Sequence, residues 1–502
     1  MNISAINNNL SFKGNAKTSI FYINDLHGQI PKMERLHSAS EHAKVIAANK
    51  GTDFFKFSSG DTFIGSNEQR NIAAASFLNV AQIDAETLGN HEFDVTASVC
   101  GQLLKNSKTN ILGMNLNFPQ APSDLSRKVK RSTIMQGKNG EKYGLIGIQP
   151  PDINYRLKKK SNLEGITVDD EAQTLKELQE EVDGLRKQGI NKIILLSHGG
   201  NELEKKIAQT VNGIDVILGG HSHDLIKDVK EGENLFYTPE GEPVVITQAG
   251  RDGTHFGVLN LEFNDKGQIV TVQNNVMDTN LYSPNLIMSK AMNSILGESP
   301  VCGSLKHVDP LAVDYLVEEN PWGDFVADAL TNQMDVDLAL INSANFRGSV
   351  DYGNVTERDI SSIFPFENKL YKVRLSEKDL VDAIKYAASS LNTHNHKPGI
   401  LQVSGLTYKI DSQGHLLSLN KKDKAGNLTP IDINNPNPNK IYTAVYDEFL
   451  VNGGDNMTSL KRNESDIIEK YNYDKDKVTI AYIKTLNQPF EVRKDNRIQI
   501  VP

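Results

Sequence analysis

Short apolar runs that end abruptly in polar residues recur through the first half of the chain. Residues 19–23 lead into Asn24-Asp25-Leu26-His27-Gly28, and residues 54–57 lead into Ser58-Ser59-Gly60-Asp61. Residues 192–196, 215–218 and 243–247 lead in the same way into Ser197-His198-Gly199-Gly200, Gly219-Gly220-His221-Ser222-His223-Asp224 and Gln248-Ala249-Gly250. This pattern predicts five buried strands that deliver polar residues at their carboxyl ends.

Helical periodicity separates these predicted strands. In the clearest case, residues 170–187, one face carries Leu175, Leu178, Val182 and Leu185, and Gly189 marks the end. Alternation of strands and helices predicts an α/β layer architecture. Ligands of open α/β sheets bind beyond the carboxyl ends of the strands, which is where all of the polar clusters fall.

The second half of the chain repeats the alternation after a turn at Asn264-Asp265-Lys266-Gly267 and a helix at 286–296. We expect helices at 322–332 and 376–391, the latter capped by Ser376. We expect strands at 337–341, 442–445, 478–483 and 498–501. A chain of 502 residues holds more than one core. The predicted parts are an N-terminal tail (1–17), a first domain (18–275), a connector (276–300) and a second domain (301–502).

Composition narrows the class of partner. The chain is 38% hydrophobic and 23% charged, which is typical of globular proteins, and its net charge is -9. That charge argues against binding a nucleic acid polymer, although a small anion can still be drawn to bound cations. Cys100 and Cys302 are the only cysteines, so we expect neither a disulfide framework nor a cysteine-based metal site. The oligomeric state stays open.

Location is predicted from two absences in the sequence. No stretch approaches the roughly 20 apolar residues of a membrane-spanning helix, so no membrane span is expected. Residues 1–17 lack the apolar core of a secretory signal. As it stands, the sequence predicts a cytoplasmic protein; a periplasmic or secreted location would follow if a leader had been removed.

The stretch Thr87-Leu88-Gly89-Asn90-His91-Glu92-Phe93-Asp94 is too polar for an ordinary core segment. Taken singly, the candidate residues have purely structural explanations. Asp25-x-His27 could be a cap, His221-x-His223 a surface pair, and Asp61 or Asn90 a turn residue. Five clusters at five strand ends favour ligand chemistry instead. Oxygen and imidazole donors without sulfur suit Zn²⁺, Mn²⁺, Fe or Co. Asp61 is the candidate to bridge two cations about 3.5–4 Å apart.

Together, these motifs resemble the conserved motifs of a known enzyme family. Asp25-Leu26-His27, Gly60-Asp61, Gly89-Asn90-His91-Glu92, His198 and Gly220-His221-Ser222-His223 are similar to the motifs of the calcineurin-like metallophosphoesterases. Residues 83–94 resemble the 5′-nucleotidase branch, which includes UDP-sugar hydrolases and 2′,3′-cyclic-nucleotide phosphodiesterases. The resemblance implies a four-layer αββα sandwich joined to a smaller α+β substrate-binding domain.

The resemblance also implies roles for the residues of the first domain. Two divalent metal ions (Zn, Mn, Co or Fe) are expected. One would be held by Asp25, His27, Asp61 and His223, and the other by Asp61, Asn90, His198 and His221. His91, oriented by Asp94, would stabilise charge on the reacting phosphoryl group.

In the second domain, Asn342-Ser343-Ala344-Asn345-Phe346-Arg347, Phe364-Pro365-Phe366 and residues 449–455 resemble the branch's C-terminal motifs. Phe366 and Phe449 would then sandwich a base, and Asn342 and Asp455 would bond sugar or base. Arg347 would approach phosphate or sugar. The plain alternatives are core packing for the phenylalanines and a turn for Gly453-Gly454-Asp455. Ser343-Ala344-Asn345 stands where many relatives carry a glycine-rich stretch.

The expected activity is that of a 5′-nucleotidase, which cleaves nucleoside 5′-monophosphates by in-line attack of a metal-bound hydroxide. UDP-sugar hydrolysis and cyclic phosphodiester hydrolysis are alternatives within the branch. Hydrolysis of thiosulfate-type groups is a further enzymatic alternative, against which the two phenylalanines argue. An alternative of another class is a catalytically silent nucleotide-binding protein.

Overall fold

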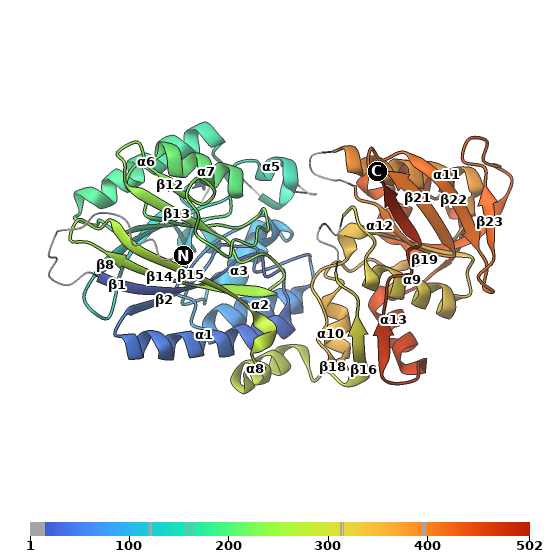
Figure 1. The fold of residues 1–502 in the computed structure, drawn as a ribbon, viewed down its shortest axis with the longest axis horizontal. Coiled ribbons are helices and arrows are strands. Elements are labelled where there is room, and N and C mark those ends of the chain that lie inside the picture. The colour runs from blue at the N-terminus through green and yellow to red at the C-terminus, as the bar shows by residue number, and fades with distance from the viewer. Residues whose placement is uncertain are drawn as a thin grey trace. The chain divides into compact units, whose positions relative to one another are not determined.

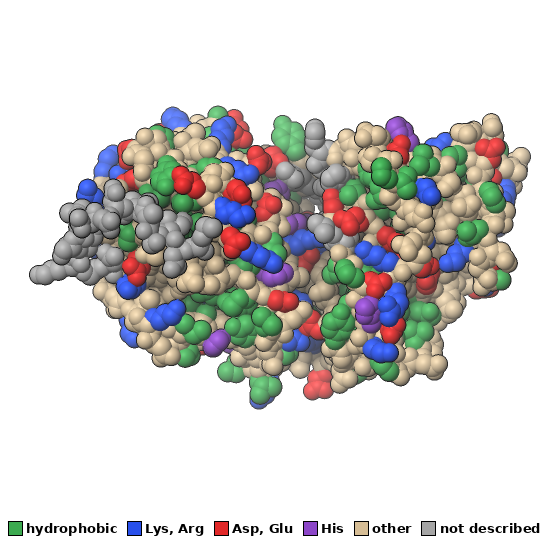
Figure 2. All heavy atoms as spheres, in the orientation of Figure 1, with side chains coloured by type: hydrophobic (Ala, Val, Ile, Leu, Met, Phe, Trp, Pro, Cys, Tyr) green, Lys and Arg blue, Asp and Glu red, His purple; other side chains and the backbone are tan. Residues whose placement is uncertain are grey.

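The computed structural model describes residues 16–119, 123–157, 160–163, 165–311, 314, 316–393 and 398–502. The chain divides into two compact units between Glu298 and Ser299 (Figure 1). Acidic and basic side chains are interspersed over the face drawn in Figure 2. Among the described residues, no helix combines the length and the apolar character needed to cross a bilayer.

Two mixed sheets form the middle of the first unit. One has the order β15 (Ile269–Asp278), β14 (His255–Phe263), β1 (Ala16–Ile23), β2 (Asp53–Ser58), β3 (Ala85–Thr87), β4 (Asn110–Leu112), β6 (Val129–Lys130). The other has the order β12 (Leu235–Tyr237), β13 (Pro243–Thr247), β11 (Val216–Leu218), β10 (Ile193–Ser197), β8 (Lys142–Ile148), β7 (Ser132–Gln136). Each sheet has parallel central strands and antiparallel strands at an edge.

Helices cover the outer face of each sheet. They are α1 (Ile30–Lys50), α2 (Glu68–Val80) and α3 (Ala97–Leu104) on the first sheet, and α6 (Glu171–Lys187) and α7 (Asn201–Thr210) on the second (Figure 1). Successive side chains of a strand point to opposite faces. Phe21 of β1 accordingly packs under the first helices and Ile20 faces the second sheet, while Ile193 and Ile194 of β10 divide in the same way. The predicted αββα layering is confirmed.

The five predicted strands are present as β1, β2, β10, β11 and β13. They belong to two sheets: β1 and β2 to the seven-stranded sheet and the other three to the six-stranded sheet. Helix α6 begins as predicted, with the Asp170 carboxylate accepting from the Gln173 amide at 2.9 Å, and Gly189 beyond its end has a φ of 80°. The turn at residues 264–267 joins β14 to β15.

The ends of the first unit differ in detail from the predicted divisions. Strand β1 begins at Ala16, within the predicted tail 1–17, and residues 1–15 lie outside the described residues. Helix α8 (Leu286–Leu296) lies within the predicted connector. Its Met288 and Met292 are buried in the same core as α1 and α2. The connector segment therefore contributes packing to the first unit as far as Glu298.

The described residues of the second unit form three small sheets. Their orders are β18 (Gly353–Thr356), β16 (Val301–Val308), β26 (Phe490–Val492); β20 (Leu401–Ser404), β17 (Leu338–Asn342), β24 (Ile441–Asp447), β19 (Leu370–Ser376), β25 (Ile467–Lys470); and β23 (Leu428–Ile431), β22 (Leu416–Lys422), β21 (Leu406–Asp411), β27 (Ile498–Val501). The helices are α9 (Pro321–Met334), α10 (Glu357–Ser362), α11 (Glu377–Ala388), α12 (Glu448–Val451) and α13 (Lys475–Thr485). Strand β17 sends Leu340 toward α11 and Ile341 toward α9 and α13. This is the expected α+β architecture.

Most elements predicted for the second unit are present, including α9, β17, α11 with its Ser376 cap, β24 and β27. The strand predicted at 478–483 is wrong, because these residues lie in helix α13. β-branched residues favour a strand by local propensity. However, Lys475, Val478, Thr479 and Ile483 are buried at helical spacing, which places them on one face. Tertiary packing of that face overrides the local preference.

Candidate active site

The predicted metal ligands of the first unit lie in loops at the carboxyl ends of five strands. Asp25 and His27 follow β1, Asp61 follows β2, Asn90 follows β3, His198 follows β10, and His221 and His223 follow β11. Donor atoms of Asp25, His27 and His223 lie within 4.8 Å of one another, and so do those of Asp61, His198 and His221. The structure thus forms two adjacent donor groups from residues far apart in sequence.

Asp61 lies between the two groups. Its Oδ2 is 3.5 Å from His27 Nε2 in one group and 3.1 Å from His198 Nε2 in the other. Asp25 Oδ1 lies 3.3 Å from His223 Nε2 and 3.8 Å from the Nε2 atoms of His27 and His198. The position of Asp61 between the two donor groups is the arrangement expected of a carboxylate shared by two cations.

Asn90 is placed by its neighbours. The His91 amide donates to Asp61 Oδ1 at 2.8 Å. A Cβ atom at Gly89 would lie 2.2 Å from that oxygen and 2.6 Å from His198 Nε2, so the glycine permits the close approach. Asn90 Oδ1 itself is buried and has no hydrogen-bond partner among the described residues. An orphaned buried acceptor beside a shared carboxylate fits a metal ligand.

Five of the seven predicted ligands have left-handed backbone conformations. The φ angles are 50° at Asp25, 48° at His27, 52° at Asp61, 72° at His221 and 63° at His223. Such conformations cost free energy for non-glycine residues and persist only when surrounding contacts impose them. Here the amides of Asp25 and His27 donate to the carbonyls of Gly60 and Asp61 at 3.0 and 2.8 Å. The loops after β1 and β2 therefore hold each other in place.

Charge in this centre is balanced between carboxylates and imidazoles. Burial opposes ionisation of Asp61, yet His198 and His91 hold the pKa of its carboxyl group well below the usual range. Burial likewise disfavours the imidazolium of His198, but Asp61 and Asp25 raise its pKa to about 10. Metal ions displace protons from such histidines when they bind. The donor set therefore fits divalent cations.

Contacts behind the ligands orient two of the histidines. His198 Nδ1 donates to the Ser59 carbonyl at 2.6 Å, which directs Nε2 toward Asp61. His27 Nδ1 lies 2.8 Å from Asp252 Oδ1. Such partners fix the tautomer and orientation of metal-binding histidines. The sequence prediction did not include Asp252, although its segment follows the noted Gln248-Ala249-Gly250 cluster after β13.

Glu92 has a structural task. Its buried carboxylate accepts from the amides of Gly89, Asp61 and Phe63, at 2.6, 3.0 and 3.0 Å. Burial and the nearby Asp61 raise the pKa of Glu92. The residue joins the loop after β2 to the loop after β3, so it holds Asp61 beside Asn90 without using its own carboxylate as a ligand.

His91 and Asp94 form the predicted pair. His91 Nδ1 lies 2.6 Å from Asp94 Oδ2, which also accepts from the Gly65 amide at 2.7 Å. Burial opposes ionisation of Asp94, but His91 lowers its pKa below the ordinary value. The ionised Asp94 therefore accepts from Nδ1. His91 Nε2 lies 4.0 Å from Asp61 Oδ2, and the side chain is 18% exposed, so its outer edge can reach a ligand.

In the second unit, contacts link three of the five predicted substrate residues: Asn342, Phe449 and Asp455. Asn342 Nδ2 donates to Asp455 Oδ2 at 3.4 Å. Gly454 lies against the ring of Phe449, where a Cβ atom would be 2.5 Å from the ring. Arg347 is buried, and its amide donates to the Ile363 carbonyl at 2.9 Å, which links its segment to the one that carries the partly buried Phe366.

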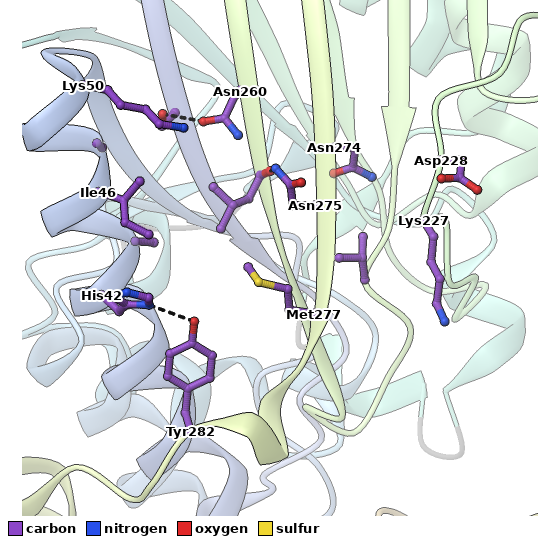
Figure 3. Close-up of a pocket in the computed structure, with 15 residues that line it drawn as sticks. His42, Ile46, Lys50, Lys227, Asp228, Asn260, Asn274, Asn275, Met277 and Tyr282 are labelled. Carbon is purple, nitrogen blue, oxygen red and sulfur yellow. Dashed lines mark hydrogen bonds between the residues drawn. The ribbon is translucent and has the colours of Figure 1, made fainter. Parts of the chain in front are cut away.

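A pocket elsewhere in the first unit is separate from these residues. It has a volume of about 460 Å³ and lies between α1 and strands β14 and β15 (Figure 3). His42, Ile46, Asn260 and Tyr282 are among its lining residues, and His42 Nδ1 lies 3.0 Å from the Tyr282 hydroxyl. None of the predicted site residues lines this pocket. The strand-end loops remain the candidate site.

Comparison with known proteins identifies both halves of the chain. Residues 18–225 match the calcineurin-like phosphoesterase family, and residues 302–462 match the 5′-nucleotidase C-terminal domain. The 5′-nucleotidase of Rattus norvegicus is 26% identical over 502 aligned residues, which cover 88% of this chain and 84% of the relative. The probable 5′-nucleotidase of Treponema pallidum is also 26% identical, with 86% and 81% coverage.

Solved structures agree on the fold. A 5′-nucleotidase precursor from Thermus thermophilus has a TM-score of 0.70 at 22% identity and covers 97% of this chain and 99% of its own. The sulfate thiohydrolase SoxB of the same organism has a TM-score of 0.66 at 16% identity, with 98% coverage of both chains. Because proteins named for different substrates share this fold, the fold alone leaves the substrate undecided.

Proposed function

Because the chain belongs to the calcineurin-like phosphoesterases and carries a 5′-nucleotidase C-terminal domain, we propose that this phosphoester hydrolase releases phosphate from nucleoside 5′-monophosphates. The observation that carries the proposal is the pair of donor groups that meet at Asp61. That centre supplies the reaction, and the aromatic and polar residues of the second unit supply recognition of the nucleoside.

We assign the donor groups to two divalent cations. Asp25, His27, Asp61 and His223 would hold one cation, and Asp61, Asn90, His198 and His221 the other. Bound cations supply Lewis-acid stabilisation of phosphoryl oxygens and increase the acidity of water. The protein contributes the geometry: left-handed backbone at five ligands, Glu92 between two loops, and Asp252 and Ser59 behind two histidines.

His91 acts on the substrate in this proposal. Since Nδ1 donates to the ionised Asp94, the free edge of the ring carries Nε2. In the proposed role, Nε2 donates a hydrogen bond to negative charge that develops on the phosphoryl group. Donors placed for a developing charge contribute most in the transition state, so His91 should influence turnover more than ground-state binding.

Recognition of the nucleoside falls to the second unit. Phe366 and Phe449 offer faces on which any base can stack. Asn342 and Asp455 offer amide and carboxylate groups to the base or sugar, and Arg347 offers a guanidinium to the phosphate or sugar. The 3.4 Å contact between Asn342 and Asp455, and the packing of Phe449 on Gly454, support a common site for these three residues.

A substrate panel tests the proposal. Phosphate release is measured from AMP, UDP-glucose and 2′,3′-cyclic AMP with the protein loaded with Mn²⁺, Co²⁺ or Zn²⁺, and Asp61→Asn serves as the inactive control. The proposal expects the highest kcat/KM for AMP. A higher kcat/KM for UDP-glucose or the cyclic nucleotide overturns the proposed substrate. Nucleotide binding without hydrolysis of any member overturns the proposed reaction.

A further inference from the structure

Asp447, which none of the predicted motifs assigns to a role, is buried behind the proposed nucleoside site of the second unit. It ends strand β24 and is 2% exposed. Its Oδ2 accepts from Lys475 Nζ of helix α13 at 2.7 Å, and Lys475 is itself 1% exposed. A buried ion pair of this kind contributes little net stability, and it can instead specify geometry.

Each oxygen of Asp447 holds a segment that carries a proposed substrate residue. Oδ1 accepts from the Leu450 amide at 3.2 Å and so caps helix α12, which contains Phe449. Oδ2 accepts from Asn345 Nδ2 at 3.3 Å. Asn345 Nδ2 also donates to Asn342 Oδ1, and Asn342 Nδ2 donates in turn to Asp455. One carboxylate therefore connects to Phe449 on one side and to Asn342 and Asp455 on the other.

The charge of Asp447 also sets the direction of this hydrogen-bond chain. An ionised carboxylate paired with lysine can only accept, so Asn345 must turn its NH₂ group toward it. That NH₂ group then meets the carbonyl oxygen of Asn342, which leaves the Asn342 NH₂ group for Asp455. Asp455 is also a carboxylate and accepts at the other end, so the two asparagines are held in one direction from both ends. With a neutral amide at position 447, nothing at the inner end requires the NH₂ group of Asn345, so Asn345 could reverse and lose its hydrogen bond to Asn342 Oδ1.

We propose that the buried Asp447–Lys475 pair is the positioning device that fixes the stacking segment with Phe449 and the donor–acceptor orientation of Asn342 and Asp455, and so sets affinity for the nucleoside part of the substrate. This inference rests on the proposed nucleotide hydrolysis. Asn345 is the link that transmits the orientation.

The main variant is Asp447→Asn combined with Lys475→Met. It removes both charges together, so no buried charge is left unpaired. Asparagine is still able to cap α12. Asn345→Ala is the second variant, because it cuts the link and leaves the ion pair and the cap in place. Ser376→Ala is the matched control: it removes a helix cap of the same unit, on α11, that contacts none of the proposed substrate residues.

Each variant is assayed, as the full-length protein loaded with Mn²⁺, with AMP and with 4-nitrophenyl phosphate, which has no nucleoside. In both variants we expect KM for AMP to rise about tenfold, while kcat/KM for 4-nitrophenyl phosphate changes less than about twofold. The control should change neither.

Parallel losses with both substrates mean a purely structural role and overturn the inference, as does an unchanged KM for AMP in Asn345→Ala. Wild-type protein that hydrolyses 4-nitrophenyl phosphate but no nucleotide overturns the proposed function as well. AMP hydrolysis by wild type, with unchanged substrate preference in both variants, overturns the inference alone.

Discussion

The two units balance buried negative charge in different ways. Among the described residues, the ion pairs of Asp25 and Asp61 in the first unit are all with histidines. In the second unit, the buried carboxylate of Asp447 pairs with the buried ammonium group of Lys475. Imidazoles give up protons to cations near neutral pH, whereas lysine and arginine keep their charge. The first unit is therefore built to exchange protons for metal ions.

An acidic group in the second unit illustrates the difference. Carboxylate oxygens of Glu319, Asp324 and Asp495 lie within 4.8 Å of one another. Arg497 lies among them, with Nε 3.4 Å from Asp324 and 2.7 Å from Asp495. Its fixed positive charge lies where a metal ion would otherwise bind, although burial and Glu319 still raise the pKa of Asp324 to about 9. Proximity of acidic residues is therefore a weaker signal of a metal site than the identity of their partners.

Removal of the shared carboxylate should give the largest effect. We expect Asp61→Asn to lower kcat/KM for AMP at least about 10³-fold, because both donor groups lose their common ligand. Metal bound per chain, measured by elemental analysis, should fall with it. The matched change Asp495→Asn in the second unit should leave metal content unchanged. Full metal content in Asp61→Asn would contradict the assignment of this residue.

His91→Ala should separate turnover from metal binding. We expect kcat to fall about 10²- to 10⁴-fold, because a donor to developing charge is lost, while metal content stays at the wild-type value. Steady-state kinetics and elemental analysis of the same preparation check both parts. Loss of metal in this variant would place His91 among the ligands and remove its proposed role.

Removal of metal should loosen the first unit only. A cation at 100 times its Kd stabilises the folded state by about 2.7 kcal/mol, so chelation should lower the free energy of unfolding by about that amount. Hydrogen exchange should quicken in the loops after β1, β2, β3, β10 and β11 and stay unchanged in β17 and β24. Equal loosening of both units would break the contrast between them.

Asp252→Asn should weaken metal binding less than the loss of a ligand. Asp252 contacts Nδ1 of His27, and partners of this kind typically contribute 10- to 100-fold in metal affinity. We expect a shift of about that size in the Mn²⁺ concentration that gives half-maximal activity. If activity falls and saturating Mn²⁺ fails to restore it, Asp252 has a role beyond orienting His27.

The smallest expected effect concerns pH. Burial raises the pKa of the partly buried Asp474, beside Lys475, to about 6. Because the pKa of Asp474 is higher in the folded state, its protonation stabilises the folded protein. This contribution to the free energy of unfolding is fully present below pH 3.8, the ordinary pKa, and is lost as pH rises through 6. Asp474→Asn should remove this dependence, which solvent screening limits to about 1 kcal/mol. Unfolding curves measured from pH 4 to 7 should show the same pH dependence of stability with and without Mn²⁺. If the pH dependence changed with Mn²⁺, the claim that the second unit is independent of metal would be contradicted.

Sequence patterns alone predict four of the five strand ends that carry candidate ligands, and the short strand β3 before Asn90 is the exception. Apolar runs followed by polar clusters mark β1, β2, β10, β11 and β13, because burial of a strand and exposure of its end leave a local trace. Strand pairing leaves no such local trace, so the apolar runs do not reveal that these strands are divided between two sheets. The strand predicted at 478–483 failed for a related reason, since long-range packing chose the helix.

The contacts that support the candidate ligands are the hardest to predict from sequence. Glu92 acts on three amides, and Asp252 reaches His27 from 225 positions away. Neither relation has a sequence spacing that would reveal it. The left-handed conformations at Asp25 and Asp61 depend on bonds between separate loops. Residue types thus predict which side chains carry chemistry, while the supporting contacts emerge only from the fold.

The central claim is that the protein is a nucleotide phosphohydrolase whose two cations share the Asp61 carboxylate as a ligand. The most direct measurement starts from exhaustively chelated protein, adds Mn²⁺ in measured equivalents, and follows metal bound per chain together with phosphate release from AMP. We expect no release from metal-free protein and full activity only when a second equivalent is bound. Phosphate release by the metal-free protein, or no release after both equivalents are bound, would contradict the account.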